Sequence, residues 1–90
     1  MIAETVIVKN PLGIHARPAA FFVQTAAKFK SDIYLSKGEV QRINGKSVMG
    51  VMMLAAEQGS EVVIEADGAD EAQAVGKLAA LLGNNFEAQT

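Results

Sequence analysis

The chain has 90 residues, of which 50% are apolar, with a net charge of −2 and no cysteine. A chain of this length forms one domain, expected over residues 1–90, and its apolar share can build a core without cross-links. The lack of cysteine excludes disulfides, thiolate catalysis and cysteine-ligated zinc, and the acidic balance argues against nucleic acid as a partner.

The first half of the chain predicts a strand, a helix and two further strands. Thr5–Val8 is a β-branched run, and the turn residues that follow it at 10–13 end the strand. From Ala16 onward, apolar residues recur at the spacing of a helix face, which predicts a helix to about Phe29. Strands are then expected over 32–36 and 40–43.

The middle of the chain predicts a short helix followed by a strand. Ser47 is a good N-cap for a helix that continues to Met53. Val51 and Leu54 on that helix are expected to pack into the core. The fourth strand is expected over Glu61–Ala66, with Val62, Ile64 and Ala66 facing the same way.

The last predicted element is a helix that begins after Asp70. Asp70 and Gln73 have the spacing of a capping box, and Gly83 is a plausible C-cap. The apolar stripe of this helix is expected to consist of Ala72, Val75, Leu78, Ala79 and Leu82. We expect residues 84–90 to form a frayed tail.

The predicted order of elements is β-α-β-β-α-β-α, which indicates an α+β fold. Such an order favours one four-stranded antiparallel sheet with three helices on one face, its other face open to water. No signal sequence opens the chain and no stretch is long enough to cross a bilayer, so we expect a soluble cytoplasmic protein without membrane insertion.

Charge is distributed unevenly along the chain. Residues 1–46 carry seven Lys or Arg and three Asp or Glu, whereas residues 47–90 carry one and seven. If the basic half gathers around one site, it could steer acidic proteins towards that site. The alternative is that these charges simply form solvated faces.

The single histidine, His15, lies in the octet Gly13–Ala20 at the start of the first predicted helix. A structural histidine that caps the helix is one interpretation of this position. Metal binding is weakly supported because the chain has no second histidine and no cysteine. An acid–base or relay role is also weakly supported, because no nucleophile-elbow or oxyanion motif accompanies the ring.

The remaining interpretation is that the imidazole itself is a nucleophile that carries a phosphoryl group. A ring with an ordinary pKa of ~6.5 is largely neutral and nucleophilic at cytoplasmic pH. The backbone N–H groups of Ala16 and Arg17, at the positive end of a helix dipole, could stabilise the phosphoryl charge. The Arg17 guanidinium could clamp the group during transfer.

Two stretches of the sequence resemble one known family. Gly13–Ala19 and Lys46–Leu54 are similar to the active-site and regulatory-serine signatures of the HPr family. These proteins are the histidine-containing phosphocarriers of the bacterial phosphoenolpyruvate-dependent sugar phosphotransferase system. The similarity covers residues 3–82, and the family fold, an open-faced β-sandwich, agrees with the order predicted above. The segment Lys37–Lys46 is slightly longer than the commonest version.

The resemblance implies a role for several residues. His15 would take a phosphoryl group on Nδ1 from phosphorylated enzyme I and pass it to IIA domains of sugar permeases, with Arg17 stabilising the charge. Ser47 would be the site that an HPr kinase/phosphorylase modifies, and its phosphate would slow the carrier by repelling acidic partners. The resemblance implies a carrier that needs no cofactor or metal and is not an enzyme.

The resemblance also implies a partner-binding surface, for which flexible methionine side chains are well suited. Its expected members are Ala20, Gln24, Val48, Met49 and Met52.

Alternatives remain open at this point. A nitrogen-branch paralogue would use the same histidine chemistry, but the intact Lys46–Gly50 stretch favours the sugar branch. A purely regulatory paralogue would bind a transcription regulator and lack the histidine. A general interaction module would carry no phosphoryl group. We expect the protein to be a monomer.

Overall fold

Four strands and three helices alternate along the chain in the predicted order. The computed structural model describes residues 1–9, 14 and 16–83. Its elements are β1 (Ile2–Ile7), α1 (Ala16–Ala26), β2 (Asp32–Lys37), β3 (Val40–Asn44), α2 (Val48–Met53), β4 (Glu61–Asp67) and α3 (Glu71–Gly83). The expected α+β order is therefore confirmed.

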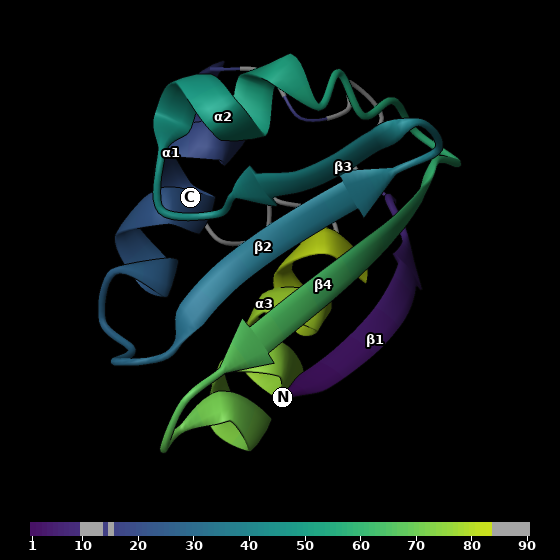
Figure 1. Ribbon diagram of the computed structural model, residues 1–90. Helices are drawn as coiled ribbons and strands as arrows, with labels where there is room; N and C mark the ends of the chain where they lie inside the picture. Colours follow the sequence, from purple (N-terminus) through teal and green to yellow (C-terminus); the bar gives the residue numbers. More distant parts are fainter. Residues whose placement is uncertain (10–13, 15, 84–90) are drawn as a thin grey trace.

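The strands form one antiparallel sheet in the order β1-β4-β2-β3. Strand β4 lies between β1 and β2, with Val62 opposite Val6 and Ile64 opposite Leu35. Figure 1 shows α1 and α3 behind the sheet, α2 over the end of β3, and the front of the sheet bare. The predicted open face is confirmed.

The core lies between the sheet and the helices behind it. In β4, the side chains of Val62, Ile64 and Ala66 are fully buried, whereas Glu61 and Asp67 at its ends are exposed. This alternation follows from the two-residue period of a strand with one wet face. The other large, fully buried apolar side chains of this core are Val8, Phe22, Ile33, Leu35, Val51, Leu54, Leu78 and Leu82.

Two predicted boundaries are shifted. The first strand ends at Ile7, and the N–H of the buried Val8 donates to the Ser60 carbonyl, outside the ladder. Helix α1 ends at Ala26 because the N–H groups of Lys28 and Phe29 bond the carbonyls three residues back. Such bonds tighten the last turn and use carbonyls that an α-helix end leaves free.

The start of α3 differs from the predicted capping box. The Asp70 carbonyl accepts the N–H of Ala74, so Asp70 stands at the N-cap position. Its carboxylate, however, binds the α1–β2 connection instead of the Gln73 N–H, and Glu71 accepts the Gly68 N–H at 3.1 Å. Ala72, predicted in the apolar stripe, is exposed, while the other four predicted members of the stripe are buried.

The Asp70 carboxylate joins two distant parts of the chain. Its oxygens accept hydrogen bonds from the Ser31 hydroxyl and from the N–H groups of Lys30 and Ser31, at 2.8 and 2.9 Å for the two amides. The Ser31 hydroxyl first, and then these amides, lower the pKa of Asp70 to about 2. The ionised carboxylate therefore fixes the α1–β2 connection against the start of α3.

The hairpin between β2 and β3 contains an irregular register. The pairing shifts between Leu35 and Lys37, and Arg42 has a φ of 52°, in the left-handed region. The Arg42 N–H donates to the Ser36 hydroxyl oxygen at 2.9 Å instead of to the ladder. This bulge accommodates the long segment between Lys37 and Lys46.

Helix α2 approaches β3 very closely at Gly50. A Cβ atom at this position would lie 2.9 Å from Ile43 Cγ2 and 3.0 Å from the Asn44 carbonyl oxygen. Only glycine allows α2 to lie this close to the strand. Gly76 in α3 is the opposite case, because a Cβ there would have no neighbour within 4 Å.

Gly50→Ala is expected to lower the free energy of unfolding by about 1–3 kcal/mol, because the added methyl group overpacks the α2–β3 contact. Gly76→Ala serves as the matched control and is expected to raise it by up to about 1 kcal/mol through helix propensity. Urea denaturation of both variants measures the two effects. Equal stability of the two variants would contradict the close-approach argument.

Asp70 is expected to make stability depend on pH in the acid range. Because its folded pKa is lowered, its contribution is present above its ordinary pKa of 3.8 and is lost as the pH falls towards about 2. Asp70→Asn should therefore be less stable at neutral pH and lose less stability over that interval. Thermal unfolding at several pH values measures the pH dependence of stability, with Glu39→Gln as the control. Parallel pH profiles for the wild type and Asp70→Asn would contradict the role of Asp70.

Candidate functional site

Two described segments flank residue 15 in the sequence. Ile14 is buried, and its N–H donates to the Ala56 carbonyl at 2.9 Å, which ties it to the segment after α2. On the other side, α1 begins at Ala16. His15 itself, like residues 10–13, lies outside the described residues. The site can therefore be located by its flanks, between the start of α1 and the end of α2.

The N-terminal turn of α1 suits an anion. Pro18 contributes no N–H, so Ala16 and Arg17 supply the backbone N–H groups that precede the first helical hydrogen bond. This turn contains no acidic residue, so no carboxylate neutralises the positive end of the dipole. Both Ala16 and Arg17 are exposed. The turn can therefore offer backbone donors and one guanidinium to a bound phosphoryl group.

Arg17 is free to act on such a group. It has no hydrogen-bond or ion-pair partner among residues 1–9, 14 and 16–83. Arg42, by contrast, pairs with Glu65 at 2.7 Å and lies 4.2 Å above the Tyr34 ring. With respect to the described residues, the guanidinium of Arg17 is therefore available, whereas that of Arg42 is engaged.

Ser47 is the N-cap of α2, as predicted. Its backbone is extended, and its hydroxyl oxygen accepts the Gly50 N–H at 3.1 Å. The side chain is half-buried. A helix of six residues is too short to be stable alone, so this cap and the packing of its inner face hold it in place.

The outer face of α2 is an apolar surface, which we call the methionine patch. Its side chains are 37%, 74%, 43% and 66% exposed at Val48, Met49, Met52 and Met53. Val51 and Leu54 point inward and are 0% and 1% exposed, as predicted. The sequence analysis missed Met53, although its spacing of four residues from Met49 places it on the same helix face.

The other two predicted surface residues lie on α1. Ala20 is half-buried and Gln24 is exposed. Figure 1 shows α1 next to α2, and the two helices pack against each other. The structure thus brings the elements that carry the predicted partner-binding residues side by side.

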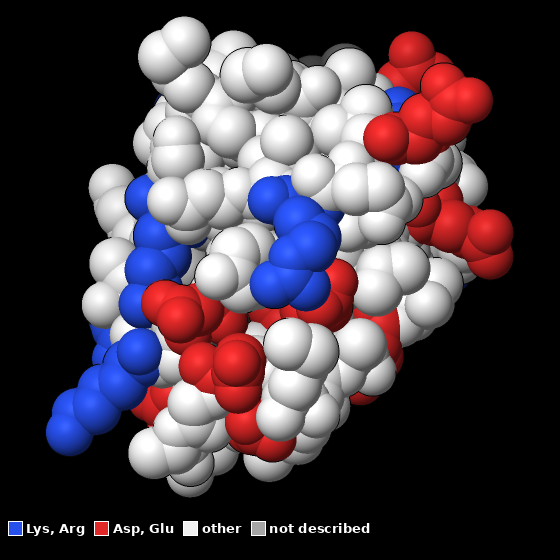
Figure 2. Space-filling view, in the orientation of Figure 1, with Lys and Arg blue, Asp and Glu red and all other residues white. Residues whose placement is uncertain are grey.

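Lysine side chains lie at both ends of α2. Lys37 Nζ donates to the Ala55 carbonyl at 2.9 Å, next to the negative end of the short helix, and Lys46 Nζ donates to the Phe29 carbonyl at 2.8 Å. In Figure 2, the surface over α2 is free of charged side chains, whereas Asp and Glu gather over the lower and right parts of the molecule. The methionine patch is therefore uncharged and bordered by cations.

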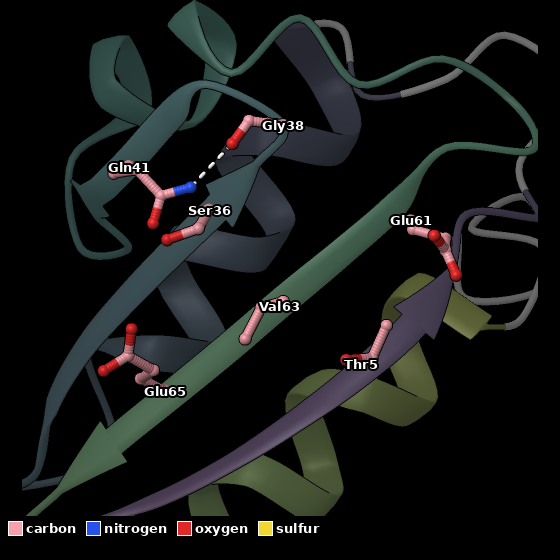
Figure 3. Close-up of a pocket in the computed structure, with 7 residues that line it drawn as sticks. All are labelled: Thr5, Ser36, Gly38, Gln41, Glu61, Val63 and Glu65. Carbon is pink, nitrogen blue, oxygen red and sulfur yellow. Dashed lines mark hydrogen bonds between the residues drawn. The ribbon is translucent and has the colours of Figure 1, made fainter.

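A pocket on the bare face of the sheet is a second candidate site. It is lined by Thr5, Ser36, Gly38, Gln41, Glu61, Val63 and Glu65 (Figure 3). Its polar groups are largely occupied, since Gln41 donates to the Gly38 carbonyl and Glu65 pairs with Arg42. None of the predicted site residues lines this pocket, so it adds no chemistry to the phosphoryl site.

In the part of the chain that the structure describes, no group of three His, Cys, Asp or Glu residues could hold a metal ion. Likewise, none of the helices over these residues is long and apolar enough to cross a membrane.

The sheet order, the helices behind it and the exposed N-terminus of α1 define an open-faced β-sandwich of the phosphocarrier class. A family model described as the PTS HPr component phosphorylation site matches residues 2–84. The chain therefore belongs to the HPr family, whose members are phosphocarriers of the phosphotransferase system and not enzymes.

Individual relatives agree with this assignment. The phosphocarrier protein HPr of Neisseria meningitidis serogroup A is 45% identical over 86 residues, which cover 96% of each chain. The HPr-like protein Crh of Bacillus subtilis is 48% identical over 80 residues, 89% of this chain and 93% of Crh.

Solved structures of relatives share the fold. HPr from Thermoanaerobacter tengcongensis superposes with a TM-score of 0.88 at 44% identity and covers 97% of both chains. A crystal structure of Crh, solved as a domain-swapped dimer, has a TM-score of 0.75 at 44% identity and covers 94% of this chain and 97% of that one.

Proposed function

We propose that this protein accepts a phosphoryl group on His15 from phosphorylated enzyme I and passes it to IIA domains of sugar permeases. The observation that carries the proposal is the N-terminal turn of α1, directly after residue 15. This turn has exposed backbone donors, no carboxylate, and an Arg17 side chain without a partner in the described part of the chain. The intact Lys46–Gly50 stretch supports the sugar branch of the phosphotransferase system.

The chemistry requires a nucleophile that can both take and release the group. The lone pair of the neutral His15 ring forms the new N–P bond while the bond from phosphorus to the donor breaks, and the reverse happens on the acceptor. Donors at the helix end contribute roughly 0.3–1 kcal/mol per charge, which stabilises the phosphoryl group without trapping it. The Arg17 guanidinium neutralises the charge that develops on its oxygens during transfer.

Partner docking is assigned to the methionine patch together with Ala20 and Gln24. A carrier must bind several partners briefly, which favours a small interface with adaptable side chains. The uncharged patch is bordered by Lys37 and Lys46, and these cations suit acidic partner surfaces. This arrangement favours fast and weak association.

Regulation is assigned to Ser47 through an HPr kinase/phosphorylase. A phosphate there adds about −1.5 to −2 charges at an N-cap, where the helix dipole tolerates them. The same charge sits at the edge of the docking patch and repels acidic partners. We further propose that the protein acts in the cytoplasm as a monomer, and that the form phosphorylated on Ser47 can engage a transcription regulator.

His15→Ala is expected to abolish phosphorylation and leave the fold intact. The wild type, incubated with phosphoenolpyruvate and enzyme I, should gain one phosphoryl group that acid removes, and it should gain none without enzyme I. Intact-mass measurement follows the adduct, and circular dichroism checks the fold. A His15→Ala variant that still takes an acid-labile group would contradict the site assignment.

Ser47→Asp is expected to slow phosphorylation of His15 severalfold, and the effect should shrink at high salt because the repulsion is screened. Ser47→Ala separates charge from capping: it should cost about 1 kcal/mol of stability and leave the transfer rate close to that of the wild type. Rates with phosphorylated enzyme I at low and high ionic strength measure both effects. An unchanged rate for Ser47→Asp at low salt would contradict the electrostatic brake.

A further inference from the structure

The most exposed apolar side chains of the described residues are methionines, and three of them share α2. Met49, Met52 and Met53 are 74%, 43% and 66% exposed, and they stand at positions i, i+3 and i+4 of the helix. The fourth methionine of the sequence, Met1, is 63% exposed and lies at the start of the chain, where its amino group pairs with Glu71 at 3.0 Å.

These thioethers are the principal targets for two-electron oxidants in this chain. The sequence contains no cysteine and no tryptophan, so neither a thiol nor an indole competes with them. A thioether reacts with peroxides to give a sulfoxide, which is polar and can be reduced again enzymatically. Because the three sulfur-bearing side chains of α2 are already open to solvent, the reaction does not require unfolding.

We propose that the methionine patch is a reversible oxidation site that switches partner docking off. A sulfur lone pair of Met49, Met52 or Met53 attacks one oxygen of hydrogen peroxide, the O–O bond breaks, and water leaves. The thioether is oxidised to the sulfoxide and the peroxide is reduced. This inference rests on the proposed docking role of the patch.

The packing of α2 explains why oxidation changes docking and not the fold. The inner face of the helix consists of Gly50, Val51 and Leu54, none of which contains sulfur, and the Ser47 cap is a hydroxyl. Oxidation therefore leaves the core contacts intact. On the outer face it replaces an apolar, adaptable surface with polar sulfoxides that a partner must desolvate on binding.

The test measures oxidation and phosphoryl transfer on the same protein. Hydrogen peroxide is added to the full chain, and peptide mapping should show sulfoxide forming fastest at Met49 and slowest at Met52, in the order of exposure. The rate of phosphorylation by phosphorylated enzyme I is then measured over a range of carrier concentrations. Oxidation should lower kcat/KM about tenfold, mostly through KM, which corresponds to about 1.4 kcal/mol. Methionine sulfoxide reductases should restore it.

One variant and one internal control separate the patch from other effects of peroxide. A triple variant with Met49→Leu, Met52→Leu and Met53→Leu keeps the apolar volume and cannot take oxygen, so its kcat/KM should not respond to peroxide. Met1, a thioether of similar exposure outside the patch, is the internal control: the loss of kcat/KM should follow sulfoxide formation on α2, and the triple variant should keep its kcat/KM although its Met1 is oxidised.

The outcomes distinguish the two proposals. Unoxidised protein that takes no phosphoryl group contradicts the carrier function itself, and with it the switch. Unoxidised protein that takes the group, combined with oxidised protein of unchanged kcat/KM, contradicts only the switch. Two further results would overturn the switch. One is a loss of the native circular dichroism spectrum on oxidation, and the other is a loss of kcat/KM in the peroxide-treated triple variant equal to that in the wild type.

Discussion

The burial of one face of β4 is the constraint on which the rest of the structure depends. This strand is hydrogen-bonded on both sides, and Val62, Ile64 and Ala66 must be covered by apolar side chains. Helix α3 packs on β4, and α1 packs against α3 behind the sheet, which leaves the opposite face of the sheet to water (Figure 1). The candidate site residues Arg17 and Ser47 accordingly lie at the ends of helices and not within the packed layers.

Helix α2 shows how a fold can present a surface on an element that is not stable alone. Six residues are too few for an isolated helix, so α2 exists because Ser47 caps it, Gly50 allows close contact with β3, and Val51 and Leu54 are buried. All of these contacts use its inner side. The outer side of α2 makes none of these contacts, so its exposed side chains are available for the partner docking proposed above.

The features that were predicted correctly depend on residues close together in the sequence. Those that were predicted wrongly depend on a partner far away in the sequence. The β4 alternation and the Ser47 cap were both predictable because each involves residues no more than a few positions apart. The predicted capping box at Asp70 was wrong because its carboxylate binds donors of Lys30 and Ser31, which are 40 and 39 residues away. Ala72 fits a helical stripe by spacing, yet it is exposed, because spacing alone does not say which part of a helix face is covered.

By itself, the sequence determined the order of the elements, the antiparallel sheet, the family and the position of Arg17 in the first turn of a helix. Each of these follows from periodicity, turn residues or a contiguous motif. Only the tertiary structure decided that Arg42 pairs with Glu65 while Arg17 has no partner among the described residues, and that Met53 joins the methionine patch. The physical reason is that exposure and pairing depend on which surfaces the packed layers cover, and that is a property of the whole fold and not of neighbouring residues.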